Sequence, residues 1–134
     1  MAEMKMPRFM ISATGSGCGK TTITCGILKA LMNRGLKVAA FKSGPDYIDP
    51  MFHSKVIGAK SRNLDVFMLG KETVKYLATK NACDVDVSVF EGAMGFYDGV
   101  HCNPIELETV MATVATKGAA SAFNGVVSVV GLYL

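Results

Sequence analysis

A glycine-rich stretch at residues 15–22 carries the residue types that bind phosphate. It reads Gly15, Ser16, Gly17, Cys18, Gly19, Lys20, Thr21 and Thr22. Glycines let successive backbone N–H groups point into one concavity, and the lysine then reaches the β- and γ-phosphates of a nucleotide. The Thr21 hydroxyl is suited to ligate Mg²⁺. The stretch therefore predicts a site for ATP and Mg²⁺, although the motif's usual first glycine is Thr14 here. A glycine-rich turn with a surface lysine is the alternative.

The sequence around this stretch predicts a strand, a loop and a helix. Residues 8–12, with the apolar run Phe9-Met10-Ile11, predict a first buried strand, and apolar residues recur at helical spacing over residues 20–34. Gly35 is typical of a helix end, and residues 36–41 predict a second strand. Two parallel strands joined by a helix bind their ligand at the carboxyl ends of the strands.

Further along the chain, the pattern continues as an α/β protein. We expect a functional loop rather than a regular element over residues 42–63, a helix over 73–80 and a strand over 85–90. A further helix over 104–117 and a last strand over 126–134 follow. The predicted fold is a P-loop NTPase, with a parallel sheet and flanking helices.

Three charged residues are expected at the carboxyl ends of these strands. Glu91 follows the strand over residues 85–90, and Asp46 lies close after the second strand, so both are candidate Mg²⁺ ligands. Lys42 would neutralise negative charge that develops on a transferred phosphoryl group or an activated carboxylate. We assign a catalytic role to Lys20, Lys42, Asp46 and Glu91, and metal binding to Thr21, Asp46 and Glu91. Ordinary surface charges are the alternative.

Two other residues are weaker candidates. His53 has no partner at metal-ligand spacing, so a structural or hydrogen-bonding role is expected rather than zinc binding. Cys18 lies in the phosphate loop, where an oxidisable thiol is one interpretation, but a tolerated small residue is the simpler one.

Composition limits the class of protein. The 134 residues suit one domain, and 14 Lys and Arg against 11 Asp and Glu give a net charge of +3 without a basic run. Nucleic acid is therefore not an expected partner. No apolar stretch approaches the roughly 18 residues of a membrane span. The four cysteines include no Cys-x-x-Cys pair, which favours free thiols and a cytoplasmic location.

Three sequence strings together resemble the cobyrinic acid a,c-diamide synthase family, which includes hydrogenobyrinic acid and Ni-sirohydrochlorin relatives. The strings are Gly-Pro-Asp-Tyr-Ile-Asp-Pro at 44–50, Ser-Arg-Asn-Leu-Asp at 61–65 and Glu-Gly-Ala-Met-Gly at 91–95, followed by Asp98 and Gly99. The resemblance covers roughly residues 8–99.

This resemblance implies a fold like that of dethiobiotin synthetase and a specific reaction. In the family, an N-terminal domain uses ATP and Mg²⁺ to phosphorylate the a and c carboxylates of a corrin-type or sirohydrochlorin-type macrocycle. A glutaminase domain supplies ammonia, which displaces phosphate to leave an amide. By resemblance, Asp46 and Glu91 organise the metal, Tyr47 lines the macrocycle side, and Asp49 and Asp98 shape the loops, with Asp98 on the substrate side.

Arg62 is a further candidate for substrate binding. A guanidinium binds a carboxylate through two hydrogen bonds, and macrocycles of this type carry several carboxylates. A salt bridge that fixes the loop is the equal alternative.

Residues 100–134 carry no string typical of the family. We therefore expect a truncated, partial synthetase domain without its glutaminase domain, and an open parallel sheet edge that associates with a second copy or a partner. A dethiobiotin-synthetase-like ligase and an inactive nucleotide-binding fragment are the alternatives. A regulatory ATPase is disfavoured, because such proteins carry a lysine where Gly15 stands.

Overall fold

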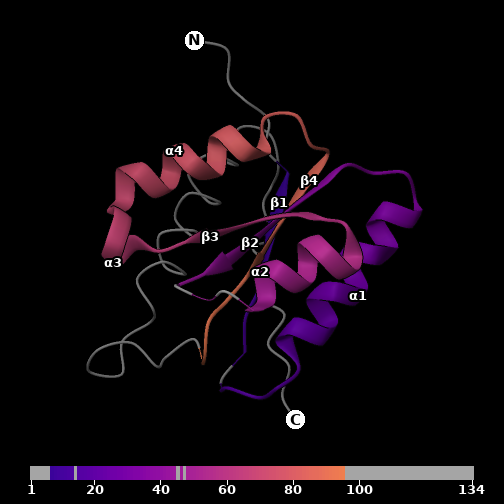
Figure 1. The fold of residues 1–134 in the computed structure, drawn as a ribbon, viewed down its shortest axis with the longest axis horizontal. Helices are drawn as coiled ribbons and strands as arrows, with labels where there is room; N and C mark the ends of the chain where they lie inside the picture. Colours follow the sequence, from indigo (N-terminus) through magenta and orange to yellow (C-terminus); the bar gives the residue numbers. More distant parts are fainter. Residues whose placement is uncertain (1–6, 14, 45, 47, 96–134) are drawn as a thin grey trace.

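The computed structural model describes residues 7–13, 15–44, 46 and 48–95. These residues form a four-stranded parallel sheet with helices on both faces (Figure 1). The elements are β1 (Arg8–Ile11), α1 (Lys20–Asn33), β2 (Val38–Ser43), α2 (Ile48–Phe52), the π-helical turn η1 (His53–Ile57), β3 (Lys60–Leu64), α3 (Val66–Leu69), α4 (Lys71–Ala82) and β4 (Val87–Glu91). The strand order is β1-β4-β2-β3, so β4, the last strand described, lies between β1 and β2.

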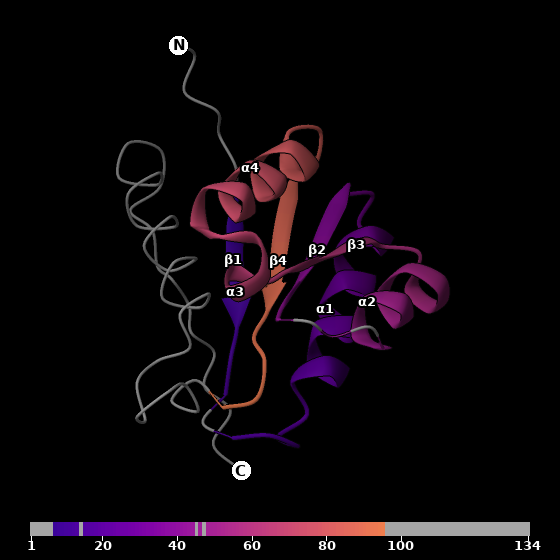
Figure 2. The same cartoon turned by 60° about the vertical axis from the view of Figure 1, so that its left-hand side comes forward.

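Alternating side chains along the strands build one core on each face of the sheet. Met10, Phe41 and Phe90 face the side covered by α3 and α4. Ile11, Ala40 and Val89 face the side covered by α1. Figure 2 shows the sheet between these two layers. Because successive residues of a strand point to opposite faces, the next residues of β2 and β4, Lys42 and Glu91, point toward the α1 side.

The register of the sheet sets which charged residues meet. Phe41 pairs with Phe90 across β2 and β4, and their rings stack with centroids 4.7 Å apart. One residue later, Lys42 pairs with Glu91. On the other side of β4, Ile11 of β1 pairs with Glu91. Glu91 therefore sits inside the sheet, at the carboxyl end of an internal strand.

Helix α1 begins directly at the phosphate loop. Gly17 and Gly19 have φ angles of 72° and 83°, which side chains with a Cβ rarely adopt. Gly19 precedes Lys20, the first helical residue, so the loop turns sharply into the N-terminus of the helix. The helix ends at Asn33, just before Gly35 at φ 82°, as the sequence predicted.

The expectation of a loop over residues 42–63 is wrong, because this segment contains α2, η1 and β3. Proline is typical of loops, but Pro50 is the third residue of α2, and the first turn of a helix tolerates proline. β3 lacks an apolar run because it pairs only with β2 among the described strands, and Lys60 and Arg62 face solvent.

The helix predicted over 73–80 is confirmed as α4, and the strands predicted over 8–12, 36–41 and 85–90 are confirmed as β1, β2 and β4. Residues 104–117 and 126–134 lie outside the described residues. In the part of the chain described, no helix is long and apolar enough to cross a membrane.

Replacing Phe41 by Ala tests the core that sets this register. Phe41 is 1% exposed, so we expect the free energy of unfolding to fall by about 3–5 kcal/mol through the lost contacts and the cavity. Phe67→Ala is the matched control, because Phe67 is 98% exposed, and it should change stability by less than about 0.5 kcal/mol. Urea denaturation measures both variants. Equal effects would contradict this description of the core.

Candidate nucleotide site

The phosphate loop borders a cavity at the carboxyl edge of the sheet. The cavity measures about 380 Å³ and is lined by Ser16, Gly17, Cys18, Gly19, Lys20, Thr21, Thr22, Lys42 and Met94. Its size falls in the range of small-molecule sites, roughly 300–1,000 Å³. The N-terminus of the 14-residue helix α1 opens onto it, and the helix dipole favours a bound anion there. Of the residues predicted to bind the nucleotide, all from Ser16 to Thr22 therefore line this cavity, and Gly15 does not.

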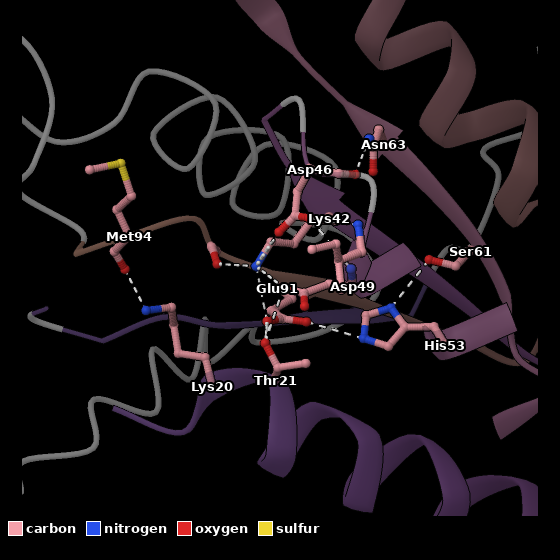
Figure 3. Close-up of polar contacts among 12 residues, drawn as sticks. Lys20, Thr21, Lys42, Asp46, Asp49, His53, Ser61, Asn63, Glu91 and Met94 are labelled. Carbon is pink, nitrogen blue, oxygen red and sulfur yellow. Dashed lines mark hydrogen bonds and ion pairs between the residues drawn. The ribbon is translucent and has the colours of Figure 1, made fainter. Parts of the chain in front are cut away.

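Lys20 lies between the phosphate loop and the segment that follows β4. Its Nζ donates hydrogen bonds to the carbonyl oxygen of Gly15 at 3.0 Å and to that of Met94 at 2.5 Å (Figure 3). The side chain is largely buried, with 7% of the residue exposed. The ammonium is therefore held at the cavity by backbone carbonyls that carry no net charge. A phosphate in the cavity would provide it with a stronger, charge-assisted partner.

A cluster of charged side chains lies beside this lysine, where β2, β4, α1 and α2 meet. The Nζ atom of Lys42 lies 3.0 Å from Glu91 Oε1 and 2.8 Å from Asp49 Oδ2. The Thr21 hydroxyl lies 2.5 Å from Glu91 Oε1 and 3.1 Å from Asp49 Oδ2. Glu91 is fully buried and Lys42 is 4% exposed. The structure thus brings together Thr21, Lys42 and Glu91, which the sequence analysis singled out, and adds Asp49.

The cluster keeps its members charged despite their burial. Burial alone raises the pKa of Glu91, but hydrogen bonds from His53 and Thr21 and the charge of Lys42 hold that pKa below its usual value. Asp49 behaves likewise: burial opposes ionisation, yet the hydrogen bond and charge of Lys42 lower its pKa. Burial lowers the pKa of Lys42, but Asp49 and Glu91 outweigh this effect and raise it. The described cluster is therefore an ammonium surrounded by ionised carboxylates.

Asp46 lies at the start of α2 and shares its side chain between backbone N–H groups and Lys42. Its Oδ1 accepts hydrogen bonds from the backbone N–H groups of Ile48 at 2.9 Å and Asp49 at 3.4 Å. These bonds cap the start of α2. Its Oδ2 lies 3.8 Å from Lys42 Nζ, at the margin of an ion pair. Asp49, expected only to shape the loop, is the aspartate that contacts Thr21.

The remaining predicted residues lie around this cluster. Arg62 is exposed on β3, and its Nη1 donates to the carbonyl oxygen of Ser61 at 2.8 Å. The Asn63 side chain donates to the carbonyl oxygen of Asp46, which ties β3 to the start of α2. Tyr47 and Asp98 lie outside the described residues. His53 is fully buried, and its contacts reach Glu91 and Ser61.

Sequence reasoning missed Asp49 as a member of the cluster. A signal for it existed, because Asp49 stands only three residues after Asp46, in the segment that follows the second predicted strand at the phosphate edge. The contact between His53 and Glu91 had no comparable signal. It depends on how η1 packs against the end of β4, 38 residues along the chain.

The donor set fits a magnesium ion accompanied by phosphate. Among the described residues, no group of three His, Cys, Asp or Glu side chains could hold a metal ion by itself. Mg²⁺ needs less than such a cage, because it is held by one or two carboxylates together with substrate phosphates and water. Glu91 and Asp49 both contact the Thr21 hydroxyl, and together their charges exceed that of Lys42. This surplus of negative charge suits a divalent cation.

Comparison with known proteins places this site in a family. The family model described as "CobQ/CobB/MinD/ParA nucleotide binding domain", CbiA, matches residues 9–131. The chain belongs to the CbiA family. The fold is accordingly a P-loop nucleotide-binding domain, and the family match extends beyond the residue-99 limit of the strings recognised in the sequence.

Curated relatives of this CbiA-family chain share one name. The protein from Thermoplasma volcanium is 50% identical over 96 residues, which are 72% of this chain and 21% of the relative. The protein from Methanocaldococcus jannaschii is 50% identical over 97 residues, 72% of this chain and 22% of the relative. The Priestia megaterium protein is 43% identical over 112 residues, 84% of this chain and 24% of the relative. Each is named cobyrinate a,c-diamide synthase. The chain spans between a fifth and a quarter of their lengths.

The lowered pKa values of Glu91 and Asp49 predict how stability depends on pH. The unfolded chain, with ordinary carboxyl pKa values near about 4, takes up protons first as the pH falls, so acid destabilises the folded state. Glu91 and Asp49 contribute their full stabilisation when the pH is above the carboxyl pKa values of the unfolded chain. This stabilisation is lost as the pH falls through the lower pKa values of the folded state. We expect the free energy of unfolding to decrease between about pH 5 and about pH 3.

Glu91→Gln should make this decrease smaller, because the neutral amide does not titrate. Glu72→Gln is the control, since Glu72 lies on the surface of α4 with its side chain 86% exposed, and it should follow the parent. Urea denaturation at a series of pH values measures the slopes. A Glu91→Gln slope equal to that of the parent would contradict the assigned pKa direction.

Proposed function

We propose that this CbiA-family chain binds Mg·ATP and activates a carboxylate as part of a cobyrinate a,c-diamide synthase. The observation that carries the proposal is the convergence of Lys20, Thr21, Lys42 and Glu91 at one edge of the sheet, beside a cavity of about 380 Å³. The names of relatives at 43–50% identity support the corrin-type substrate. Sirohydrochlorin-type macrocycles have the same side-chain chemistry and are included in the proposal.

The proposed reaction has two steps. A side-chain carboxylate oxygen of the macrocycle attacks the γ-phosphorus of ATP, and ADP leaves with the electron pair of the broken P–O bond. The product is an acyl phosphate, in which the carboxyl oxygen has become a good leaving group. Ammonia then attacks the acyl carbon, phosphate leaves, and a proton is lost to give the amide. Glutamine would supply the ammonia through a glutaminase domain elsewhere in the full synthase.

The described residues suit the first of these steps. Lys20 would exchange its carbonyl partners for the β- and γ-phosphate oxygens, and the N–H groups at the start of α1 would bind the phosphates. Lys42 would stabilise charge on the transferred phosphoryl group, because it is already fixed at the cavity by two carboxylates. Its position needs little reorganisation during the reaction.

The proposed cation site is formed by Thr21 and Glu91, beside Lys42. When bound, Mg²⁺ would screen the phosphate charges and make ADP a better leaving group. Thr21 and Glu91 are its proposed ligands, together with Asp46, as the sequence suggested, or with Asp49, which the contacts favour. Tyr47, Arg62 and Asp98 are proposed on the substrate side. The exposed Arg62 guanidinium is suited to a macrocycle carboxylate.

Lys20→Ala tests the nucleotide site. It removes a charge-assisted phosphate contact, so we expect ATP binding to weaken by about 2 kcal/mol, or about thirtyfold in Kd. Lys29→Ala is the matched control, because Lys29 is an exposed lysine of the same helix. Calorimetric titration of the 134-residue chain with Mg·ATP measures all three proteins. Equal affinities for Lys20→Ala and the parent would refute the phosphate assignment.

A second experiment tests the chemistry. Joined to the remainder of a complete synthase and supplied with ammonia, this chain should support ATP-dependent amidation of a corrin-type or sirohydrochlorin-type carboxylate, whereas the 134-residue chain alone should not. Glu91→Gln should slow turnover strongly, because a neutral amide is a poor ligand for a hard cation. Glu72→Gln should keep the parent rate. Mass spectrometry counts the amides formed, and ADP release should match that count.

Two results would count against this mechanism. One is a completed enzyme that hydrolyses ATP without amidating any macrocycle carboxylate. The other is full turnover by Glu91→Gln, which would show that the buried carboxylate takes no part in holding the cation.

A further inference from the structure

A buried histidine stands behind the Glu91 carboxylate. His53, in η1, is fully buried, and both of its ring nitrogens face polar atoms. Its Nδ1 lies 3.2 Å from the Ser61 hydroxyl oxygen, and its Nε2 lies 3.1 Å from Glu91 Oε2. Figure 3 shows the imidazole on the far side of Glu91 from Lys20. Neither ring nitrogen faces the phosphate loop.

Polar partners hold the His53 ring from both sides. Nε2 lies 3.1 Å from Glu91 Oε2, and a carboxylate oxygen can only accept a hydrogen bond from a ring N–H. On the other side, Nδ1 lies 3.2 Å from the Ser61 hydroxyl, which can donate or accept. Among the described residues, neither Nε2 nor Oε2 has another hydrogen-bond partner. The imidazole is therefore the polar neighbour of the buried Oε2.

The two oxygens of Glu91 consequently have different partners. Oε1 contacts the Thr21 hydroxyl at 2.5 Å and the Lys42 ammonium at 3.0 Å, on the side of the phosphate loop. Oε2 contacts His53 on the opposite side. Rotation of the carboxylate would break contacts at both ends at once. The contact to His53 thus favours the carboxylate plane in which one oxygen, labelled Oε1, faces the cluster of Thr21 and Lys42 and the other faces the imidazole.

We propose that His53 is a positioning residue for the cation site, which fixes Glu91 so that Oε1 is presented to the Mg²⁺ of bound nucleotide. The proposal rests on the Mg·ATP function argued above. Side chains that orient a metal ligand in this way typically change metal affinity by about 10–100-fold when removed. A histidine with only a packing role would affect stability and leave the contribution of Mg²⁺ to nucleotide binding unchanged.

Two amide variants separate these roles. In His53→Asn, the amide group takes the place of Nδ1 and keeps a polar partner for Ser61, but it is too short to reach Glu91. In His53→Gln, the amide reaches the place of Nε2 and can donate to Glu91. Ser54→Ala, an exposed neighbour in the same turn, is the control.

The measured quantity is the magnesium gain, the ratio of the ADP dissociation constants in EDTA and in excess Mg²⁺. Calorimetric titration of the 134-residue chain gives both constants, and thermal unfolding checks that each variant is folded. We expect His53→Asn to lower the magnesium gain about tenfold while the ADP affinity in EDTA stays at the parent value. His53→Gln and Ser54→Ala should keep most of the gain.

The outcomes distinguish this proposal from the function on which it rests. A parent chain that binds ADP without any magnesium gain would contradict the proposed Mg·ATP site itself. If His53→Asn keeps the magnesium gain of the parent, only the role of His53 is overturned. The same follows if His53→Gln loses as much of the magnesium gain as His53→Asn. If His53→Asn does not fold, Ser61→Ala replaces it, because it leaves the imidazole in place but removes the hydroxyl that holds Nδ1 and keeps the ring turned toward Glu91. A Ser61→Ala gain equal to the parent's then overturns the proposal.

Discussion

The ionised carboxylate of Glu91, buried at the end of an internal strand, is the constraint on which the rest of the site depends. A buried charge is tolerated only when charged or hydrogen-bonding partners replace the water it has lost, and removing one partner of a buried pair costs about 3–5 kcal/mol. Here those partners come from α1, β2 and η1, which are far apart in the sequence. The fold has to bring these elements together around a single side chain. That requirement explains why the apolar residues that align the strands also determine the positions of the charged residues in the site.

The sheet supplies that arrangement through its register. The stacked pair of Phe41 and Phe90 aligns β2 with β4, and the next pair in the same register is Lys42 with Glu91. A slip of one residue in either strand would turn the charge of that strand toward the apolar layer under α4. The charge balance of the cluster then serves binding: carboxylates in excess of the Lys42 ammonium suit a divalent cation, and the adjacent loop and Lys20 suit the phosphates. The excess negative charge therefore favours binding of Mg·nucleotide but lowers the stability of the protein without a ligand, because a bound cation relieves the repulsion between the carboxylates.

Much of this could be predicted from the sequence, for identifiable reasons. The phosphate loop, α1 and Glu91 were predictable because glycine-lysine-threonine spacing and apolar periodicity are local signals. β3 was not, because a polar edge strand such as Lys60–Leu64 lacks the apolar run by which strands are recognised. The position of Asp49 and the contact from His53 to Glu91 also escaped prediction. Both depend on how the 48–57 segment folds over the end of β4, a tertiary arrangement with no local signature. Only the resemblance to a family and the names of the relatives point to the proposed substrate class.

A double-mutant cycle between Lys42 and Glu91 tests the central claim most directly. The free energy of unfolding would be measured by urea denaturation for the parent, Lys42→Met, Glu91→Gln and the double variant. If the buried pair organises the site, each single change removes the charged partner of the other residue, so the double variant should be more stable than the sum of the two losses predicts. We expect a coupling energy of at least about 2 kcal/mol. Losses that simply add would contradict the account, because Lys42 and Glu91 would then be neighbours without a shared energetic role.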